Sequence, residues 1–370
     1  MKKKILFVIH DLGQGGAEKV LVSLVNHMSR DLFDVSVLSL FGGGVNEKYL
    51  APDVKHRSVY KKDYPGNSKI MKLFSPRHLY KKYIKEKYDI VVSYLEGPSA
   101  RIVSGCDDGA KIVTWIHGEQ PDLRSASASF RSDKEAKACY GKFEKIVCVS
   151  NTVKNNFDAL FGLDDKTCVL YNTVESDKIK ALSTEHIDLF GSDDNTVRLV
   201  SVGSLKQVKG FDRLIRVHKK LIDSEYKVHT YILGKGQDGE KLARYAEDMG
   251  VSDSFTFLGY DTNPYKYVSK CDIYVCSSFR EGFSTAATEA LIAGTPVCTV
   301  EVSGMKELLG DNNENGIVTE NSEDALCDGL KRLLDDPELL DSYKAAASKR
   351  GETFSTENTV KAVEDMILGL

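Results

Sequence analysis

The sequence predicts an α/β protein of two Rossmann-like, doubly wound lobes that face each other across a cleft. Short runs of Val, Ile, Leu and aromatic residues alternate with helical stretches along both halves of the chain, as the strands of buried parallel sheets do. The length of 370 residues exceeds what one ordinary core holds and suggests two domains of about 150–200 residues. Each half is therefore expected to build its own sheet.

The expected strands form two sets, separated by a polar segment. The first set is 3–10, 33–40, 88–95, 110–117, 145–150 and 167–172, and the second is 198–205, 228–234, 253–260, 271–278, 295–302 and 315–320. The stretch 185–197 between them is polar, contains Gly and Asp, and is the expected linker. The predicted division is an N-terminal domain 1–190, a C-terminal domain 191–353 and a C-terminal helix 354–370, with Ser355 or Thr356 as its cap.

Composition excludes several classes of protein. A net charge of −4 with 28% charged residues does not favour a nucleic-acid-binding protein. The eight cysteines form no C-x-x-C pair and are expected to be reduced core thiols, not metal ligands or disulfides. The N-terminal apolar run, Ile5 to Ile9, is too short for a signal peptide, and no apolar stretch is long enough to span a membrane. A cytoplasmic protein is expected.

Positive charge is concentrated in residues 61–87. This segment holds nine Lys or Arg residues against two acids, interleaved with Leu, Ile, Tyr and Phe as on an amphipathic surface helix. One interpretation is a solvated helix face. The other is peripheral contact with an anionic membrane surface or an anionic acceptor, at the inner face of the cell membrane.

A glycine-rich turn follows the first strand. Gly13, Gly15 and Gly16 lead into a helix, so that backbone N–H groups can approach an anion at the helix start. A dinucleotide-binding fingerprint needs a third glycine where Glu18 stands, and an acid at the end of the second strand, which is missing. A Rossmann oxidoreductase is therefore disfavoured, while a phosphate loop and a plain turn both stay open.

The second half places cations and acids at strand ends. Lys206 and Lys209 follow the strand 198–205 and precede a helix expected near Gly210, which suits a phosphate. Ser284 is a natural N-cap, and amides near Ser284 and Thr285 favour a diphosphate.

Two glutamates, Glu281 and Glu289, flank that helix start. Phosphate would repel them, so they are expected to accept hydrogen bonds from sugar hydroxyls. A ligand with hydroxyls on both sides of a diphosphate is a nucleotide sugar. Glu289 is then expected to hold the ribose and Glu281 the transferred sugar. No D-x-D occurs in the chain, so no metal or other cofactor is expected, and the lysines and amides neutralise the leaving diphosphate.

Together these residues resemble the retaining glycosyltransferases of family 4 (group 1), which have the two-lobed GT-B fold and include enzymes of capsule and exopolysaccharide synthesis. The resemblance covers nearly the whole chain and is densest from 197 to 318. Glu281 and Glu289 match the family's E-x7-E motif, and Lys209 matches its donor-phosphate lysine. Where the family commonly has an arginine before that lysine, this chain has Ser204, and Lys206 is the expected replacement.

The resemblance extends to further motifs. The donor site it implies includes Gly282, Phe283, Ser284, Thr285, Gly234, Gly236, Leu258 and Tyr260. The motif GGAEK, with Gly15, Gly16 and Glu18, matches a family loop that lies near the donor phosphate and the acceptor. The resemblance also matches His117 to a histidine near the reacting sugar, where it would position the sugar or polarise a hydroxyl. The C-terminal helix matches a segment that crosses back onto the N-terminal lobe.

Position alone adds two candidates. Glu96 and Asn172 stand at strand ends of the first half, on the expected acceptor side.

The resemblance implies a metal-independent, front-face transfer from a nucleotide sugar, expected to be a UDP-sugar, to a hydroxyl of a glycan or a lipid-diphosphate-linked glycan. In that route the departing phosphate oxygen takes the acceptor's proton. Two alternatives stay open at this point. One is a nucleotide-sugar epimerase or phosphorylase-type enzyme on the same scaffold, and the other is a non-catalytic nucleotide-sugar-binding subunit.

Overall fold

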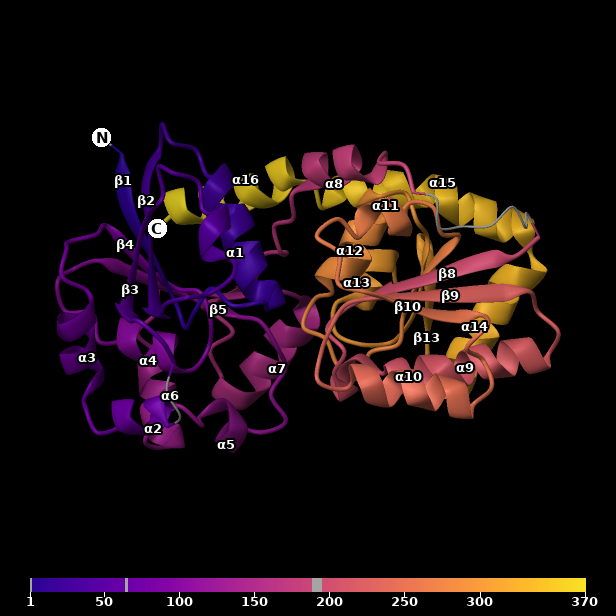
Figure 1. The fold of residues 1–370 in the computed structure, drawn as a ribbon. Helices are drawn as coiled ribbons and strands as arrows, with labels where there is room; N and C mark the ends of the chain where they lie inside the picture. The colour runs from indigo at the N-terminus through magenta and orange to yellow at the C-terminus, as the bar shows by residue number, and fades with distance from the viewer. Residues whose placement is uncertain (1, 64–65, 188–194) are drawn as a thin grey trace. The chain divides into compact units, whose positions relative to one another are not determined.

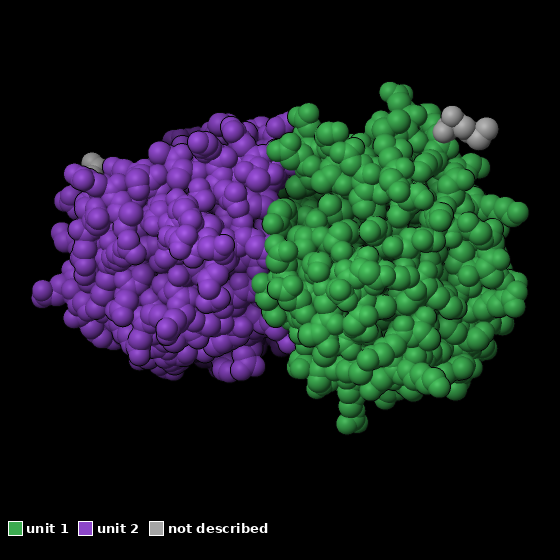
Figure 2. Space-filling model, turned by 180° about the vertical axis from the view of Figure 1, so that it is seen from behind, with its two compact units in different colours: residues 1–174, 356–370 green, residues 175–355 purple. Residues whose placement is uncertain are grey.

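The alternation of apolar runs and helical stretches builds two parallel sheets, one in each half of the chain (Figure 1). The structure, a computed structural model, describes residues 2–63, 66–187 and 195–370. The chain forms two compact units, the first made of residues 1–174 and 356–370 and the second of residues 175–355 (Figure 2).

The first unit contains a seven-stranded parallel sheet in the order β3-β2-β1-β4-β5-β6-β7. Its strands are β1 (Lys3–Ile9), β2 (Phe33–Phe41), β3 (Lys55–Tyr60), β4 (Ile90–Ser93), β5 (Lys111–Ile116), β6 (Lys145–Cys148) and β7 (Thr167–Val169). The strand order reverses beside β1, which pairs with β2 on one side and β4 on the other. In such open sheets, ligands bind outside the carboxyl ends of the strands at this switch point.

Helices connect the strands of the first unit, and the C-terminal helix packs on the first one. They are α1 (Gly16–His27), η1 (Glu47–Tyr49), α2 (Asn67–Met71), α3 (Pro76–Tyr83), α4 (Pro98–Val103), α5 (Leu123–Ala126), α6 (Asp133–Tyr140), α7 (Asn151–Phe161) and α16 (Thr356–Leu368). The hydroxyl of Thr356 donates to the carbonyl of Val174, and Glu364 accepts from the N–H of Ser29. These bonds tie α16 to the first unit.

The second unit contains a six-stranded parallel sheet in the order β10-β9-β8-β11-β12-β13. Its strands are β8 (Val197–Val202), β9 (Val228–Leu233), β10 (Phe255–Gly259), β11 (Ile273–Cys276), β12 (Val297–Val300) and β13 (Gly316–Thr319). Here the order reverses at β8, between β9 and β11. The loops after β8 and β11 therefore flank the switch point of this sheet.

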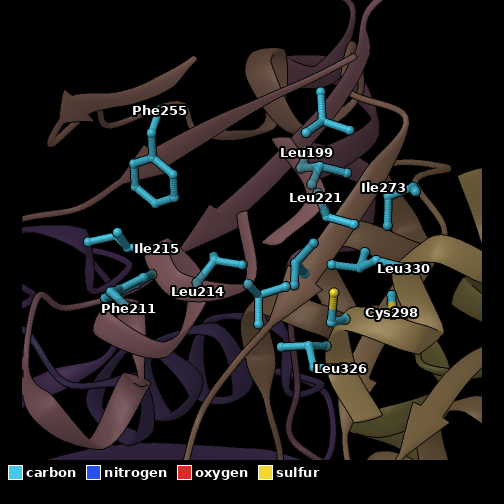
Figure 3. Packing of buried hydrophobic residues seen from close by; sticks show 14 of the residues in the cluster. Leu199, Phe211, Leu214, Ile215, Leu221, Phe255, Ile273, Cys298, Leu326 and Leu330 are labelled. Atoms are coloured by element: carbon cyan, nitrogen blue, oxygen red, sulfur yellow. The ribbon is translucent and has the colours of Figure 1, made fainter. Parts of the chain in front are cut away.

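Two helical layers cover the second sheet (Figure 1). The helices are α8 (Ser176–Ser183), η2 (Gln207–Lys209), α9 (Phe211–Asp223), α10 (Gly239–Asp248), α11 (Tyr265–Val268), α12 (Thr285–Ile292), α13 (Met305–Leu309), α14 (Glu323–Asp335) and α15 (Pro337–Thr353). Helices α8, α11, α12 and α15 pack on one another, and α9 packs with α10 and α14. Figure 3 shows the core under α9 and α14, where Leu214, Leu221, Leu326 and Leu330 meet strand residues such as Leu199 and Ile273.

The twelve expected strands are all present, so the predicted fold class is confirmed. One strand, β3, was not predicted. It lies at the edge of its sheet, and its sequence KHRSVY begins with four polar or charged residues instead of forming an apolar run. An edge strand has one neighbour and an exposed side, so it needs less apolar sequence than a central strand.

The first segment of the first unit ends at Val174, sixteen residues before the predicted end of the N-terminal domain at 190. Residues 176–183 form α8, which packs on α11 and α12 of the second unit. Packing, which sequence composition does not show, therefore assigns these residues to the second unit. Most of the expected linker 185–197, including the predicted boundary at 190, lies outside the described residues.

The core of the second unit contains a buried histidine, His218 of α9, which is 0% exposed. Its ring nitrogens form hydrogen bonds of 2.8 Å with the hydroxyls of Thr230 and Ser254. Burial, with a smaller contribution from the charge of His229, lowers the pKa of His218 from 6.5 to about 4. The side chain is therefore neutral in the folded protein at pH 7.

We expect this histidine to make the second unit less stable as the pH falls. His218 binds a proton near pH 6.5 in the unfolded chain and only near pH 4 in the folded chain. The stability that depends on neutral His218 is therefore fully present above about pH 6.5 and is lost as the pH falls to about 4. The total loss is about 3 kcal/mol. Urea unfolding of His218→Gln across this pH range should show a pH dependence smaller by that amount. The exposed His78→Gln variant should keep the wild-type dependence, and an unchanged slope in His218→Gln would contradict the assignment.

Candidate functional site

The loops after β8 and β11 bring together a lysine and a glutamate from the predicted site. Lys209, the last residue of η2, places its Nζ 2.7 Å from Oε1 of Glu281. The hydroxyl of Ser278 donates to the same oxygen at 2.6 Å. The Glu281 side chain is 10% exposed and that of Lys209 28% exposed, so the pair is only partly accessible to water. A cation, a hydroxyl and a carboxylate thus meet at the switch point.

The backbone of this site depends on Gly210. This residue adopts φ +64°, and a Cβ atom on it would lie 2.1 Å from the carbonyl oxygen of Ser277. Only glycine permits this conformation together with such a close approach of two loops. The loops are also joined by the hydrogen bond from the N–H of Phe279 to the carbonyl of Val208, at 2.8 Å. Gly210 therefore lets α9 begin directly beside the loop that carries Glu281.

A buried arginine holds the same loop. Arg213 of α9 is 3% exposed and donates to the carbonyls of Ser277 and Ser278, the latter at 2.9 Å. Its guanidinium carbon lies 4.4 Å from the ring centroid of Phe279, and Nη1 donates to Asn321 at 2.7 Å. Arg213 thus fixes the loop that presents Ser278 and Glu281.

The helix start after Glu281 forms as predicted. Ser284 is the N-cap of α12, and its hydroxyl accepts from the N–H of Ala287 at 3.3 Å. The N–H groups of Thr285 and Ala286 begin the helix beside this cap. Glu289 lies on α12 and is 7% exposed. Gly304, at φ +80°, brings the β12–α13 loop against Gly282 and Phe283.

The other predicted donor residues lie at or just after the carboxyl ends of β8, β9 and β10. A Cβ atom on Gly234 would lie 1.8 Å from the carbonyl oxygen of Gly203, and one on Gly236 would lie 2.2 Å from that of Leu205. The β9–α10 loop therefore adjoins the β8 loop. Leu258 ends β10 with Gly259, and the exposed Tyr260 follows, its ring centroid 4.7 Å from the Lys235 Nζ. Ser204 and Lys206 are exposed. The structure does not bring Lys206 into the Lys209–Glu281 contact.

In the first unit, His117 and Glu96 lie together at the ends of β5 and β4. The N–H of His117 donates to Oε2 of Glu96 at 3.1 Å. Burial lowers the pKa of His117 to about 4, against a hydrogen bond to the Tyr94 backbone that raises it. Burial raises the pKa of Glu96, opposed by the bond from His117. Nε2 of His117 is buried and has no hydrogen-bond partner among the described residues.

The glycine-rich turn after β1 contains a second acid–histidine contact. Nδ1 of His10 lies 2.7 Å from Asp11, whose other oxygen accepts from the N–H of Gly13 at 2.6 Å. This contact raises the pKa of His10 and lowers that of Asp11. Glu18 folds back over Gly15, where a Cβ atom would lie 2.0 Å from its carboxylate. Gly16 begins α1.

The last predicted residue of this unit, Asn172, lies just after β7 and is buried.

Sequence reasoning missed Ser278 and Arg213. Ser278 stands at the end of a buried strand three residues before Glu281, a position that could have marked it. Arg213 lies among Phe211, Leu214 and Val217 on the buried face of α9, and a charged residue within an apolar face is the signal that could have found it.

Among the described residues, no group of three His, Cys, Asp or Glu side chains is arranged to hold a metal ion. All eight cysteines are unpaired, and six of them are buried. In the described part of the chain, no helix has both the length and the apolar character to cross a bilayer.

Two Rossmann-like units with parallel sheets of seven and six strands are the architecture of GT-B proteins. A solved structure of Anabaena Alr3699/HepE in complex with UDP and glucose has this fold, with a TM-score of 0.78 at 17% identity over 100% of both chains. The apo lipopolysaccharide outer core galactosyltransferase WaaB matches with a TM-score of 0.71 at 18% identity, over 99% of both chains.

Sequence comparison then identifies the family. The model "Glycosyltransferase Family 4" matches residues 14–178, and "Glycosyl transferases group 1" matches residues 183–350. The chain belongs to this family of glycosyltransferases and is an enzyme of hexosyltransferase type. The family is retaining and metal-independent.

Two curated relatives act on bacterial glycans according to their names. One is the N-acetylgalactosamine-N,N'-diacetylbacillosaminyl-diphospho-undecaprenol 4-alpha-N-acetylgalactosaminyltransferase of Campylobacter jejuni, 27% identical over 99% of this chain and 100% of the relative. The other is the lipopolysaccharide core biosynthesis glycosyltransferase LpsE of Rhizobium meliloti, 22% identical over 96% of this chain and 95% of the relative.

Proposed function

We propose that this enzyme moves a hexose or N-acetylhexosamine from a UDP-sugar to a hydroxyl of a lipid-diphosphate-linked glycan in the synthesis of a bacterial surface polysaccharide. The Campylobacter relative, whose acceptor is diphospho-undecaprenol-linked, supports the acceptor class. The HepE complexes with UDP and with UDP-glucose support the donor class. The observation that carries the proposal is the Lys209–Glu281 pair at the switch point of the second sheet.

The donor side follows from that pair. A diphosphate arriving at the loop after β8 offers Lys209 a stronger partner than one carboxylate, because it carries more negative charge. Glu281 then accepts hydrogen bonds from hydroxyls of the transferred sugar, with Ser278 holding one of its oxygens. The N–H groups at the start of α12 and Lys206 bind the remaining phosphate oxygens. The buried carboxylate of Glu289 holds the ribose hydroxyls, and the loops of Gly234, Gly236, Leu258 and Tyr260 line the nucleoside.

The acceptor side uses the first unit. The neutral ring of His117 can form a hydrogen bond with a sugar hydroxyl through its buried Nε2, which lacks a partner among the described residues. The contact with Glu96 fixes the backbone at His117. The turn with Gly15, Gly16 and Glu18 and the side chain of Asn172 complete the proposed acceptor side.

Transfer then proceeds on one face of the sugar. The bond between the anomeric carbon and the diphosphate oxygen breaks, the acceptor oxygen bonds to the same carbon, and the departing phosphate oxygen takes the acceptor's proton. Lys209 and the amides of α12 stabilise the charge that develops on the diphosphate. We propose that the transfer needs no metal or cofactor, because Lys209, Lys206 and the amides of α12 stabilise the negative diphosphate.

A screen of nucleotide sugars for thermal stabilisation tests the donor assignment. A ligand that binds only the folded protein stabilises it by about 2.7 kcal/mol at a free concentration of about 100 Kd. UDP-hexoses or their N-acetyl forms are expected to raise the melting temperature, and the corresponding GDP- and CDP-sugars are not. If no UDP-sugar raises the melting temperature, the donor-site assignment is refuted.

A transfer assay tests the reaction. With a stabilising UDP-sugar and lipid-diphosphate-linked saccharides, the expected product is a saccharide longer by one α-linked sugar, together with UDP. An isomerised sugar would indicate the epimerase-type alternative. Binding without turnover of any such acceptor would indicate a non-catalytic subunit.

A further inference from the structure

Residues 69–74 form a short apolar tip on the first unit. Leu73 is 75% exposed, more than any other large apolar side chain in the part of the chain that the structure describes. Ile70 is 47% and Phe74 38% exposed. Three such side chains within five residues are not expected on a surface that faces only water, because exposing apolar area costs free energy.

The large apolar residues of α3, within the basic segment 61–87, point inward. Leu79, Tyr80 and Tyr83 of α3 are buried, each at 4% exposure or less. The outer face of α3 therefore carries only polar and charged side chains such as Lys81 and Lys82. The large apolar residues of α3 belong to the core, so in the described part of this segment the exposed large apolar side chains are those of the tip.

Two arginines hold the backbone of the tip. Arg101, 1% exposed, donates to the carbonyls of Met71 at 3.0 Å and Phe74 at 2.8 Å. Arg131 donates to the carbonyls of Lys72 at 2.6 Å and Leu73 at 3.0 Å. All four carbonyls from 71 to 74 are thus bound. The tip is a fixed projection, and its side chains do not gain exposure from a loosely attached loop.

Positive charge surrounds the apolar side chains. Lys69 and Lys72 lie within the tip, and Nζ of Lys82 is 5.6 Å from the ring centroid of Phe74. Further along α3, Arg77 and Lys81 share Asp107, so their charge is partly neutralised. A small apolar group surrounded by lysines matches the interface of an anionic bilayer, where apolar side chains enter the boundary of the acyl chains and lysines meet lipid phosphates.

We propose that residues 69–74 dock this enzyme onto an anionic phospholipid bilayer. Leu73 and Ile70 enter the interface, and Lys69, Lys72 and Lys82 lie against the headgroup phosphates. Neither contribution is sufficient alone, since so few apolar residues give only marginal binding and lysines alone bind weakly at high salt. The inference rests on the proposed function in one respect, because a lipid-linked acceptor resides in such a bilayer.

Sedimentation with vesicles, without any donor or acceptor, tests the surface. The full chain is expected to bind vesicles of phosphatidylcholine with phosphatidylglycerol, to bind phosphatidylcholine alone much less, and to dissociate as salt increases. Leu73→Ser should weaken binding about tenfold, and the double variant Lys69→Ser/Lys72→Ser roughly 20-fold. Leu32→Ser, at another exposed leucine, and Lys241→Ser/Lys270→Ser, at exposed lysines of the second unit, are matched controls and should bind as wild type.

The proposal is overturned if the protein ignores anionic vesicles at low salt, if it binds neutral vesicles equally well, or if the tip variants bind as tightly as their controls. Stabilisation of the same variants by UDP-sugars separates this result from the donor assignment. Leu73→Ser should keep the wild-type shift, since Leu73 lies in the first unit and outside the proposed donor residues. If Leu73→Ser loses vesicle binding but UDP-sugars still raise its melting temperature, the result supports the docking surface independently of the donor assignment.

Discussion

Replacing Glu281 by Gln is expected to lower kcat/KM by about 100- to 1000-fold, the effect typical of removing one preorganised electrostatic contact in an active site. The amide keeps the volume of the side chain and loses the charge that pairs with Lys209 and accepts from Ser278. If Glu281 holds the transferred sugar as the bond breaks, kcat decreases more than KM for the donor increases. Initial rates at varied UDP-sugar concentration measure both constants.

The chain offers a matched control for this variant. Glu301 lies the same 2.7 Å from Lys306, but both side chains are about half exposed, at 52% and 47%. Glu301→Gln is expected to leave kcat and KM unchanged, because a solvated pair of this kind contributes little. Wild-type rates in Glu281→Gln would contradict the assigned role. Equal losses in both variants would point to a general effect of removing a surface charge.

Replacing Glu135 by Gln is expected to lower the free energy of unfolding of the first unit by about 3–5 kcal/mol. Oε1 of Glu135 lies 2.9 Å from Arg101, which is 1% exposed, and its other oxygen accepts from the N–H of Arg131 at 2.6 Å. Without the carboxylate, the guanidinium of Arg101 stays buried with no opposite charge. Urea unfolding followed by fluorescence of Trp115 measures the loss, because this sole tryptophan lies in β5 of the same unit.

The control for this prediction is Glu144→Gln. Glu144 and Lys111 form a pair of 3.4 Å with about half of each side chain exposed, so the expected change is below about 0.5 kcal/mol.

Burial raises the pKa of Glu135, but the bonds from Arg101 and Arg131 lower it to below 4.5 overall. The stability from Glu135 is therefore complete above pH 4.5 and is lost as the pH falls through the lowered pKa. A small loss in Glu135→Gln would show that Arg101 finds other partners.

Most strands could be predicted from the sequence because central parallel strands are buried on both faces and must be apolar throughout. β3 could not, since an edge strand tolerates Lys55, His56 and Arg57. The helix starts at Phe211 and Thr285 were predictable from the local signals Gly210 and Ser284, which act within one turn. The end of the first unit was not, because α8 is assigned by its packing on α11 and α12.

For the candidate site, local spacing was enough to place Lys209 and Glu281 at strand ends, but not to pair them. The pair exists because β8 and β11 are neighbours in the sheet although their ends, Val202 and Cys276, lie 74 residues apart in the chain, and because Gly210 lets the two loops approach. Ser278 and Arg213 act through the same contact between the loops, so a local sequence pattern could mark their positions but not their partners.

By itself, the sequence of this protein determined the two-sheet α/β class, the family motifs and the strand ends that carry charged residues. Each of these depends on contacts within a few residues along the chain. Only the tertiary structure decided which residue meets which. The tertiary structure pairs Glu281 with Lys209 and buries Arg101 beside Glu135. It also packs the apolar side of α3 in the core and leaves Leu73 exposed to solvent. Those outcomes depend on contacts between distant segments, where burial and charge pairing are settled by packing.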